Sequence, residues 1–308
     1  MSSSMSPSLP ELETLITQHS FLTLESSNSR FLNAPGEGLP LLVVNTPACH
    51  AVIALQGAHL LEFTPVGAAP LLWLSPNCVF TAGNALRGGV PVCLPWFGPN
   101  REDPSKPKHG FARNTPWNLT SVTDNGGAGC ELTFTLVSAP NALFAYAFTA
   151  QLKMTLGKTA KLELSMSNTD SKAFACSWAL HSYHPVSSLE KVRVKGLSGR
   201  DYLDNLEGHA RKHQAEDVRF DGEVDRVFPG IENSLSIEEA DSTKPITITH
   251  HNCPSVIVWN PGATNAAKIA DIGPGQEQHY ICVERGAVLS EEWQIASGAT
   301  QSAWLEIA

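Results

Sequence analysis

The densest group of residues suited to chemistry lies between Arg87 and Arg113. This segment contains five basic and two acidic side chains, a local charge of +3 in a chain whose formal charge is −9. Its basic residues are Arg87, Arg101, Lys106, Lys108 and Arg113. One arginine guanidinium group can donate two hydrogen bonds at once to phosphate oxygens, so this composition is suited to binding a small anion. By charge alone, a solvated surface loop is the favoured interpretation, because such loops are the commoner case.

The remaining composition of this segment favours a functional loop. Gly88 and Gly89 allow the backbone to approach a ligand closely, and five prolines stiffen the connection. Trp96 and Phe97 supply flat apolar faces of the kind that stack on sugar rings. Long, rigid, aromatic and basic loops more often carry functional residues than serve only as connections.

A candidate general base is Glu284, in the segment Tyr280–Gly286. The residue ends an apolar run just before a glycine, where we expect the strand to end. Partial burial there would raise the pKa of the carboxyl group toward that of a useful base. The alternative is an ion pair with Arg285 or with another base, and spacing alone favours it.

The histidines do not form a metal-binding pattern. His181 and His184 are three apart, so on a strand they point to opposite faces, and adjacent His250 and His251 diverge as well. We therefore expect hydrogen-bonded structural histidines and no metal. The seven cysteines form no C-x-x-C pair, and no nucleophile elbow or phosphate-binding glycine loop follows a strand.

The elements that must position these residues are mostly strands. One helix is predicted near the start, where Ser8 to Glu11 fit a capping box and Leu12, Leu15 and Ile16 follow at helical spacing. Thereafter short apolar runs are bounded by turn residues. The predicted strands are Leu41–Val44, Ala51–Leu55, His59–Phe63, Leu71–Leu74, Glu131–Val137, Ala145–Leu156, Lys161–Ser167, Ala173–Leu180, Lys191–Lys195, Ile246–Thr249, Ser255–Trp259, Tyr280–Val283 and Ala303–Ile307.

This order of elements predicts an all-β fold, a large antiparallel sandwich or barrel, because parallel units would need crossover helices. Gln56-Gly57 and Leu156-Gly157-Lys158 are expected to be tight connections, and 123–129 a hairpin tip. We expect an N-terminal leader and helix over 1–20 and a single β-sandwich catalytic domain over 21–308.

Composition excludes several classes of protein. The chain has 308 residues, 42% of them hydrophobic, and no apolar run near the ~20 residues needed to cross a bilayer. Its net charge of −9 argues against a general nucleic-acid or membrane-surface binder. The odd, scattered cysteines and the absence of a visible secretory signal indicate a reduced, cytoplasmic protein, which we expect to be a monomer.

Several motifs together resemble a known family. RGGVPVCLPWFG, KHGFARNTPWNL, ALHSYH, GEVDRVF, VIVWNP and ICVERG occur in the order found in hexose-6-phosphate mutarotases. These are the glucose-6-phosphate 1-epimerases of the aldose 1-epimerase superfamily. The resemblance runs from about Leu41 to the C-terminus. It implies a galactose mutarotase-like supersandwich whose active site is an open cleft on one sheet, and an enzyme that interconverts the anomers of hexose 6-phosphates without a cofactor.

The resemblance also implies roles for particular residues. His181 would be the general acid and Glu284 the general base. Binding residues would be Arg87, Lys108 and Arg113 for the anionic ligand, Asp225 for sugar hydroxyls and His109 for positioning the ring. The sequence departs from the family pattern at His184, where an aromatic ring is usual, and at Lys108, where Gln is frequent. The first change bears on the shape of the cleft and the second on anion binding.

Two other functions compete with this one. A non-catalytic carbohydrate-binding sandwich would use the aromatic and basic residues but not an acid–base pair. A mutarotase for unphosphorylated aldoses such as galactose would have no use for the basic segment. A glycosidase generally needs two opposed carboxylates, and the sequence nominates only Glu284.

Overall fold

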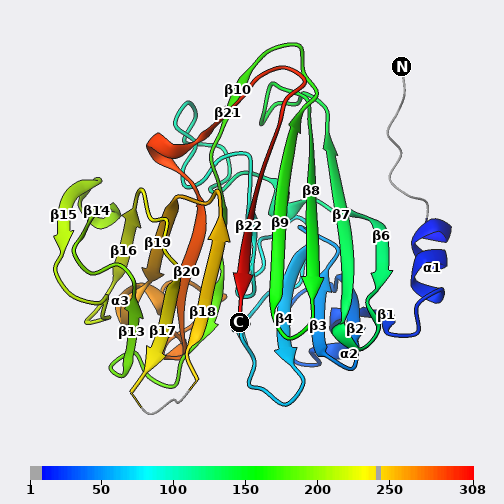
Figure 1. Ribbon diagram of the computed structural model, residues 1–308, viewed down its shortest axis with the longest axis horizontal. Coiled ribbons are helices and arrows are strands. Elements are labelled where there is room, and N and C mark those ends of the chain that lie inside the picture. Colours follow the sequence, from blue (N-terminus) through cyan, green and yellow to red (C-terminus); the bar gives the residue numbers. More distant parts are fainter. Residues whose placement is uncertain (1–8, 241–243) are drawn as a thin grey trace.

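The computed structural model describes residues 9–240 and 244–308, and shows a protein built from antiparallel sheets (Figure 1). The predicted all-β class is therefore confirmed. The predicted helix is confirmed as α1 (Leu9–Thr17), which contacts the sheets near β1 and β6, whereas Ser8 of the expected capping box lies outside the described residues. No helix of the described residues has the length and apolarity needed to cross a membrane.

One eight-stranded sheet forms the wall of the sandwich away from the site. Its central strands alternate buried and partly exposed residues, so one face packs into the core and the other faces solvent. In spatial order its strands are β13 (Val192–Lys195), β17 (Leu235–Glu239), β18 (Ile246–His251), β22 (Thr300–Ile307), β9 (Ala160–Asn168), β8 (Phe148–Leu156), β7 (Cys130–Ser138) and β6 (Asn118–Asp124).

A second eight-stranded sheet carries most of the cavity described below. In this sheet β12 (Tyr183–Pro185) pairs with β20 alongside β11. The other strands, in order, are β15 (Ala210–Gln214), β14 (Arg200–Asp204), β16 (Val224–Phe228), β19 (Ser255–Asn260), β20 (Tyr280–Ala287), β11 (Trp178–Leu180) and β5 (Val92–Cys93). All eight residues of β20 are buried, so this strand is covered on both faces.

Two smaller sheets and several short helices complete the fold. The first sheet contains β1 (Leu22–Ser26), β2 (Pro40–Asn45), β3 (Cys49–Ala54) and β4 (His59–Pro65), and the second β10 (Phe174–Cys176) and β21 (Trp293–Ile295). The short helices are α2 (Ser27–Arg30), α3 (Gly262–Ala266), η1 (Ala112–Asn114), η2 (Gly126–Ala128), η3 (Asn205–Glu207), η4 (Gln276–His279) and η5 (Leu289–Glu291). The predicted connections at Gln56-Gly57 and Leu156-Gly157-Lys158 and the tip at 123–129 are confirmed.

Three strand predictions were wrong, one entirely and two in part. Leu71–Leu74 is not a strand, because its amides bond to separate segments: Leu71 N–H donates to Phe63 and Trp73 N–H to Tyr183. The run predicted over 173–180 divides at Ser177 into β10 and β11, which pair in different sheets. The run predicted to start at residue 145 becomes a strand only at Phe148.

Candidate active site

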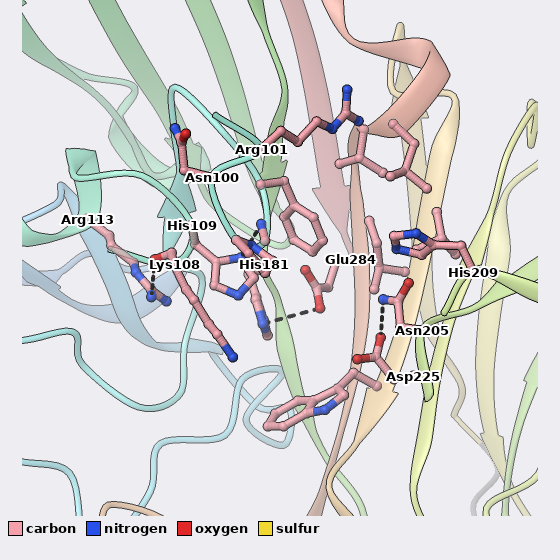
Figure 2. Close-up of a pocket in the computed structure, with 18 of the residues that line it drawn as sticks. Asn100, Arg101, Lys108, His109, Arg113, His181, Asn205, His209, Asp225 and Glu284 are labelled. Carbon is pink, nitrogen blue, oxygen red and sulfur yellow. Dashed lines mark hydrogen bonds and ion pairs between the residues drawn. The ribbon is translucent and has the colours of Figure 1, made fainter. Parts of the chain in front are cut away.

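A cavity of about 690 Å³ opens on the second sheet and brings together all seven site residues expected from the sequence (Figure 2). These residues are Arg87, Lys108, His109, Arg113, His181, Asp225 and Glu284. They come from three strands or their ends and from the long basic loop, so the fold gathers positions that are distant in sequence. Phe97 and Trp259 add aromatic surface to the lining.

His181 and Glu284 form a close pair in this cavity. His181 Nε2 lies 3.3 Å from Glu284 Oε1, and the side chains are 8% and 1% exposed. His181 follows β11, where its N–H donates to the carbonyl of Pro91, and Glu284 lies within β20. The two groups can therefore exchange a proton directly or act together on one small molecule.

The sequence prediction that Glu284 ends its strand was wrong. β20 continues to Ala287, and Gly286 lies within the strand. A Cβ atom on Gly286 would lie 2.1 Å from the carbonyl oxygen of Trp178, so the glycine permits close pairing with β11 and makes no turn. Glu284 is buried because it lies within a strand covered on both faces.

The alternative ion pair between Glu284 and Arg285 is also absent. Neighbouring residues on a strand point to opposite faces, and the Arg285 guanidinium donates instead to three backbone carbonyls. Its Nη1 lies 2.7 Å from the oxygen of Ile231, and further bonds reach the carbonyls of Cys253 and Asn233. Arg285 thus holds loops together behind the sheet, and Glu284 remains available to the cavity.

Burial sets the protonation of the pair. It lowers the pKa of His181 well below its ordinary value, and His109, Arg113 and Arg87 lower this pKa further. Burial raises the pKa of Glu284 well above its ordinary value, and Asp225 adds to this shift. Both directions favour an uncharged imidazole beside a protonated carboxyl over the charged pair.

His109 is a second histidine beside the pair, its ring centre 5.8 Å from that of His181. Gly98 N–H donates to its Nδ1 over 3.2 Å, which leaves the ring proton on Nε2. Burial and the nearby cation of Arg113 lower the pKa of His109 to about 3. The ring is therefore neutral and can donate one hydrogen bond to an oxygen.

Arg87 is held by other residues of the protein. It donates to the hydroxyl of Tyr183 over 3.1 Å and to the carboxylate of Asp271 over 3.2 Å. Tyr183 in turn stacks on His181, with ring centres 4.9 Å apart and planes 12° apart. Arg87 therefore lines the cavity and also fixes the ring on which His181 rests. Sequence reasoning did not find Asp271.

Lys108 and Arg113 form the freer basic side of the cavity (Figure 2). Arg113 donates to the carbonyl oxygen of Lys108 over 3.0 Å, which ties the two residues into one corner. The ammonium group of Lys108 is in an exposed residue that extends along the cavity. This corner can bind an anion while water still reaches it.

Asp225 lies on the opposite side, next to Asn205 (Figure 2). Asn205 Nδ2 donates to Asp225 Oδ1 over 2.6 Å. Burial raises the pKa of Asp225 to about 6, although this bond opposes the shift. The carboxylate is ionised at neutral pH and can accept hydroxyl protons from a sugar. Sequence reasoning did not find Asn205.

His184 does not line the cavity. It is fully buried behind the site, and its Nδ1 lies 3.1 Å from the carbonyl oxygen of Leu71. The expected hydrogen-bonded structural role is confirmed for this residue. The departure from the usual family motif therefore lies in the buried packing and not in the lining of the cavity.

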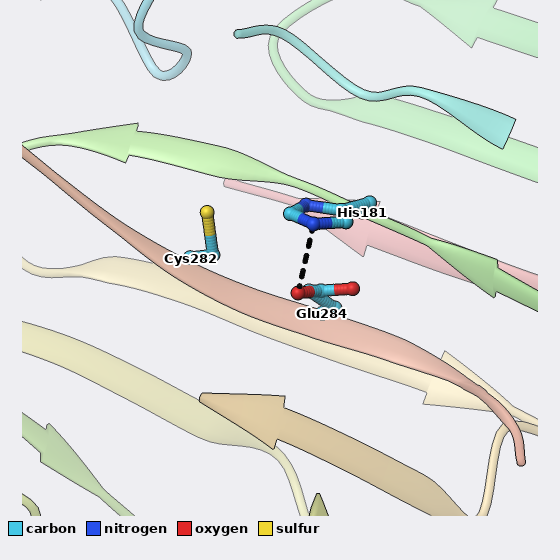
Figure 3. Close-up of side chains that lie close together, drawn as sticks. All are labelled: His181, Cys282 and Glu284. Atoms are coloured by element: carbon cyan, nitrogen blue, oxygen red, sulfur yellow. Dashed lines mark ion pairs between the residues drawn. The ribbon is translucent and has the colours of Figure 1, made fainter. Parts of the chain in front are cut away.

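One group of side chains has the composition of a metal site. His181, Cys282 and Glu284 each offer a ligand atom, all within 4.8 Å of one another (Figure 3). A thiol must lose its proton to bind a metal, but burial and Glu284 raise the pKa of Cys282 well above its ordinary value. Arg87, Lys108 and Arg113 line the same cavity and repel a cation. This chemistry does not favour a metal.

Comparison with known proteins identifies the family. The family described as aldose 1-epimerase matches residues 40–308. The chain belongs to this family. A relative from Salmonella typhimurium, named "Putative glucose-6-phosphate 1-epimerase", is 38% identical over 251 residues, which cover 80% of this chain and 83% of the relative. One from Cenchrus ciliaris with the same name is 31% identical over 276 residues, covering 83% of each chain.

A solved structure agrees with this placement. The crystal structure of a "putative mutarotase" from Salmonella typhimurium superposes with a TM-score of 0.82 at 34% identity, covering 88% of this chain and 90% of that one. The predicted family and the galactose mutarotase-like fold are therefore confirmed. The chain is an enzyme of the aldose 1-epimerase family.

Proposed function

We propose that this enzyme interconverts the α and β anomers of hexose 6-phosphates, as a glucose-6-phosphate 1-epimerase. The observation that carries the proposal is the buried His181–Glu284 pair in the same cavity as three basic side chains. The relatives from Salmonella typhimurium and Cenchrus ciliaris carry the name of that activity.

The proposed reaction needs one base and one acid. Glu284 as carboxylate takes the proton of the C1 hydroxyl, and His181 as imidazolium gives its proton to the ring oxygen. The bond between C1 and the ring oxygen breaks, its electron pair stays on that oxygen, and C1 becomes an aldehyde. Rotation about C1–C2 and reclosure, with the proton transfers reversed, produce the other anomer.

The electrostatics of the cavity suit this sequence of steps. Ring opening converts the charged pair into neutral His181 and protonated Glu284, which is the state that burial favours. The open-chain aldehyde therefore meets a pair already at its preferred protonation. Each well-placed acid or base typically contributes ~10²–10⁴ in rate.

The phosphate takes no part in the proton transfers. We place it at the corner formed by Lys108 and Arg113, with Arg87 nearby, where it supplies binding and orientation. His109 then donates from Nε2 to an oxygen of the sugar. We also propose that the enzyme acts as a monomer and, with seven free buried cysteines, in the reducing cytoplasm.

The test is anomer exchange measured by NMR or polarimetry on freshly dissolved α-glucose 6-phosphate and on α-glucose. The proposal predicts much larger acceleration, in kcat/KM, for the phosphate ester. Equal acceleration of the two sugars would instead favour a mutarotase for unphosphorylated aldoses. Binding of the phosphate ester without acceleration would favour a carbohydrate-binding module and contradict the proposal.

A further inference from the structure

Asn205 lies in a firmly held turn at the side of the cavity opposite the basic corner (Figure 2). It opens η3, between β14 and β15, and the preceding Asp204 caps this turn by accepting from Leu206 N–H over 3.0 Å. Asp204 also accepts from the ammonium of Lys212 over 2.7 Å. The backbone of Asn205 is therefore fixed before any ligand binds.

The carboxamide of Asn205 makes a hydrogen bond through only one of its two polar atoms. Its Nδ2 donates to Asp225 Oδ1, whereas its Oδ1 is buried and makes no hydrogen bond with the part of the chain that the structure describes. A buried acceptor without a donor is unfavourable and uncommon. Asn205 lines the cavity, but this oxygen is itself shielded, so the side chain acts on a ligand through its bond to Asp225.

Asp225 presents a second acceptor next to it. Its Oδ1 is occupied by Asn205, and within residues 9–240 and 244–308 no hydrogen bond engages its Oδ2. The Asp225 carboxylate therefore keeps one acceptor free, and the bond from Asn205 holds it in place. A hydroxyl group of a pyranose can donate to this acceptor.

The position of this pair within the cavity decides which hydroxyls are meant. In Figure 2 the His181–Glu284 pair lies between the corner of Lys108 and Arg113 on one side and Asn205 with Asp225 on the other. In a hexose 6-phosphate, the ring oxygen leads from C1 toward C5 and the phosphate, and C2 and C3 lie on the other side of C1. With C1 at the acid–base pair, the 2- and 3-hydroxyls face Asn205 and Asp225.

We propose that Asn205 is a positioning residue, which holds the Asp225 carboxylate to bind a hydroxyl at C2 or C3 and so sets specificity there. This inference rests on the proposed function for the location of C1 and of the phosphate. Asn205 acts through Asp225: its bond to Oδ1 fixes the direction in which the free Oδ2 points.

The experiment compares Asn205→Ala and Asn205→Ser with Leu206→Ala, an exposed neighbour outside the cavity lining. Substrates are glucose 6-phosphate and its 2-deoxy and 3-deoxy analogues. For glucose 6-phosphate we expect kcat/KM to fall roughly three- to tenfold in the Asn205 variants, mainly through KM. With one deoxy analogue the loss should disappear, because the hydroxyl that the positioned Asp225 binds is missing. Leu206→Ala should behave as wild type on all three.

A second readout separates this role from a merely structural one. Because the bond from Asn205 lowers the pKa of Asp225, its removal should shift the acid limb of kcat/KM to higher pH. An equal loss on all three substrates would overturn the inference. If wild type lacks anomerase activity, the proposed function fails, and the same comparison by calorimetric binding of the three sugar phosphates still decides the role of Asn205.

Discussion

Glu284 Oε1 lies 3.3 Å from His181 Nε2, and the environment of both groups favours their uncharged forms. Burial thus lowers the pKa of the imidazole and raises that of the carboxyl, which moves the preference for a proton from His181 toward Glu284. The charged arrangement needed to begin ring opening and the neutral arrangement left after it differ only in the location of protons.

The pH profile of kcat should be flat through neutrality. Lowering the pH adds a second proton only below the lowered pKa of His181, and raising it removes the carboxyl proton only above the raised pKa of Glu284. Activity at saturating glucose 6-phosphate should therefore be constant across pH 6.5, the ordinary pKa of histidine. Groups with ordinary pKa values would instead give a bell between 4.5 and 6.5, which would contradict the account.

His181→Asn should lower kcat by ~10²–10⁴, because the ring oxygen loses its proton donor. The double variant with Glu284→Gln should be little worse than either single variant, since the two groups act as a unit. Exchange rates of the three variants on glucose 6-phosphate test this. Multiplying losses in the double variant would show that the residues act independently.

Lys108→Gln should raise KM for glucose 6-phosphate by roughly tenfold and leave kcat nearly unchanged, because a charge-assisted contact to the phosphate is lost. The residual activity on unphosphorylated glucose should not change. Lys106→Gln, in the same loop but outside the cavity lining, is the matched control. A fall in kcat with constant KM would place Lys108 in the chemistry instead.

Gly286→Ala should destabilise the protein by about 1–3 kcal/mol, because its Cβ would meet the backbone of Trp178 at 2.1 Å. Gly127→Ala is the control, since a Cβ there meets nothing within 4 Å. Thermal or urea unfolding of the two variants measures the difference. Equal stability would mean that β11 and β20 can separate at no cost.

Sequence reasoning located the cavity's main residues because local motifs carry them. It misjudged Glu284, since a glycine two positions later resembles a turn but instead permits close strand pairing. It missed β14 and β15, because their mostly polar sequences, RDYLD and ARKHQ, show no hydrophobic alternation. Asn205 and Asp271 could not be inferred, because their roles depend on contacts with Asp225 and Arg87 that only the folded chain creates.

The most direct test of the account is anomer exchange by the Glu284→Gln variant, with Glu163→Gln on the solvent-facing side of β9 as control. Two-dimensional exchange NMR on glucose 6-phosphate gives the rate, and calorimetry gives the affinity. We predict that Glu284→Gln loses exchange by ~10²–10⁴ while it still binds the sugar phosphate, and that the control matches wild type. Exchange at the wild-type rate in Glu284→Gln would contradict the assignment of the base.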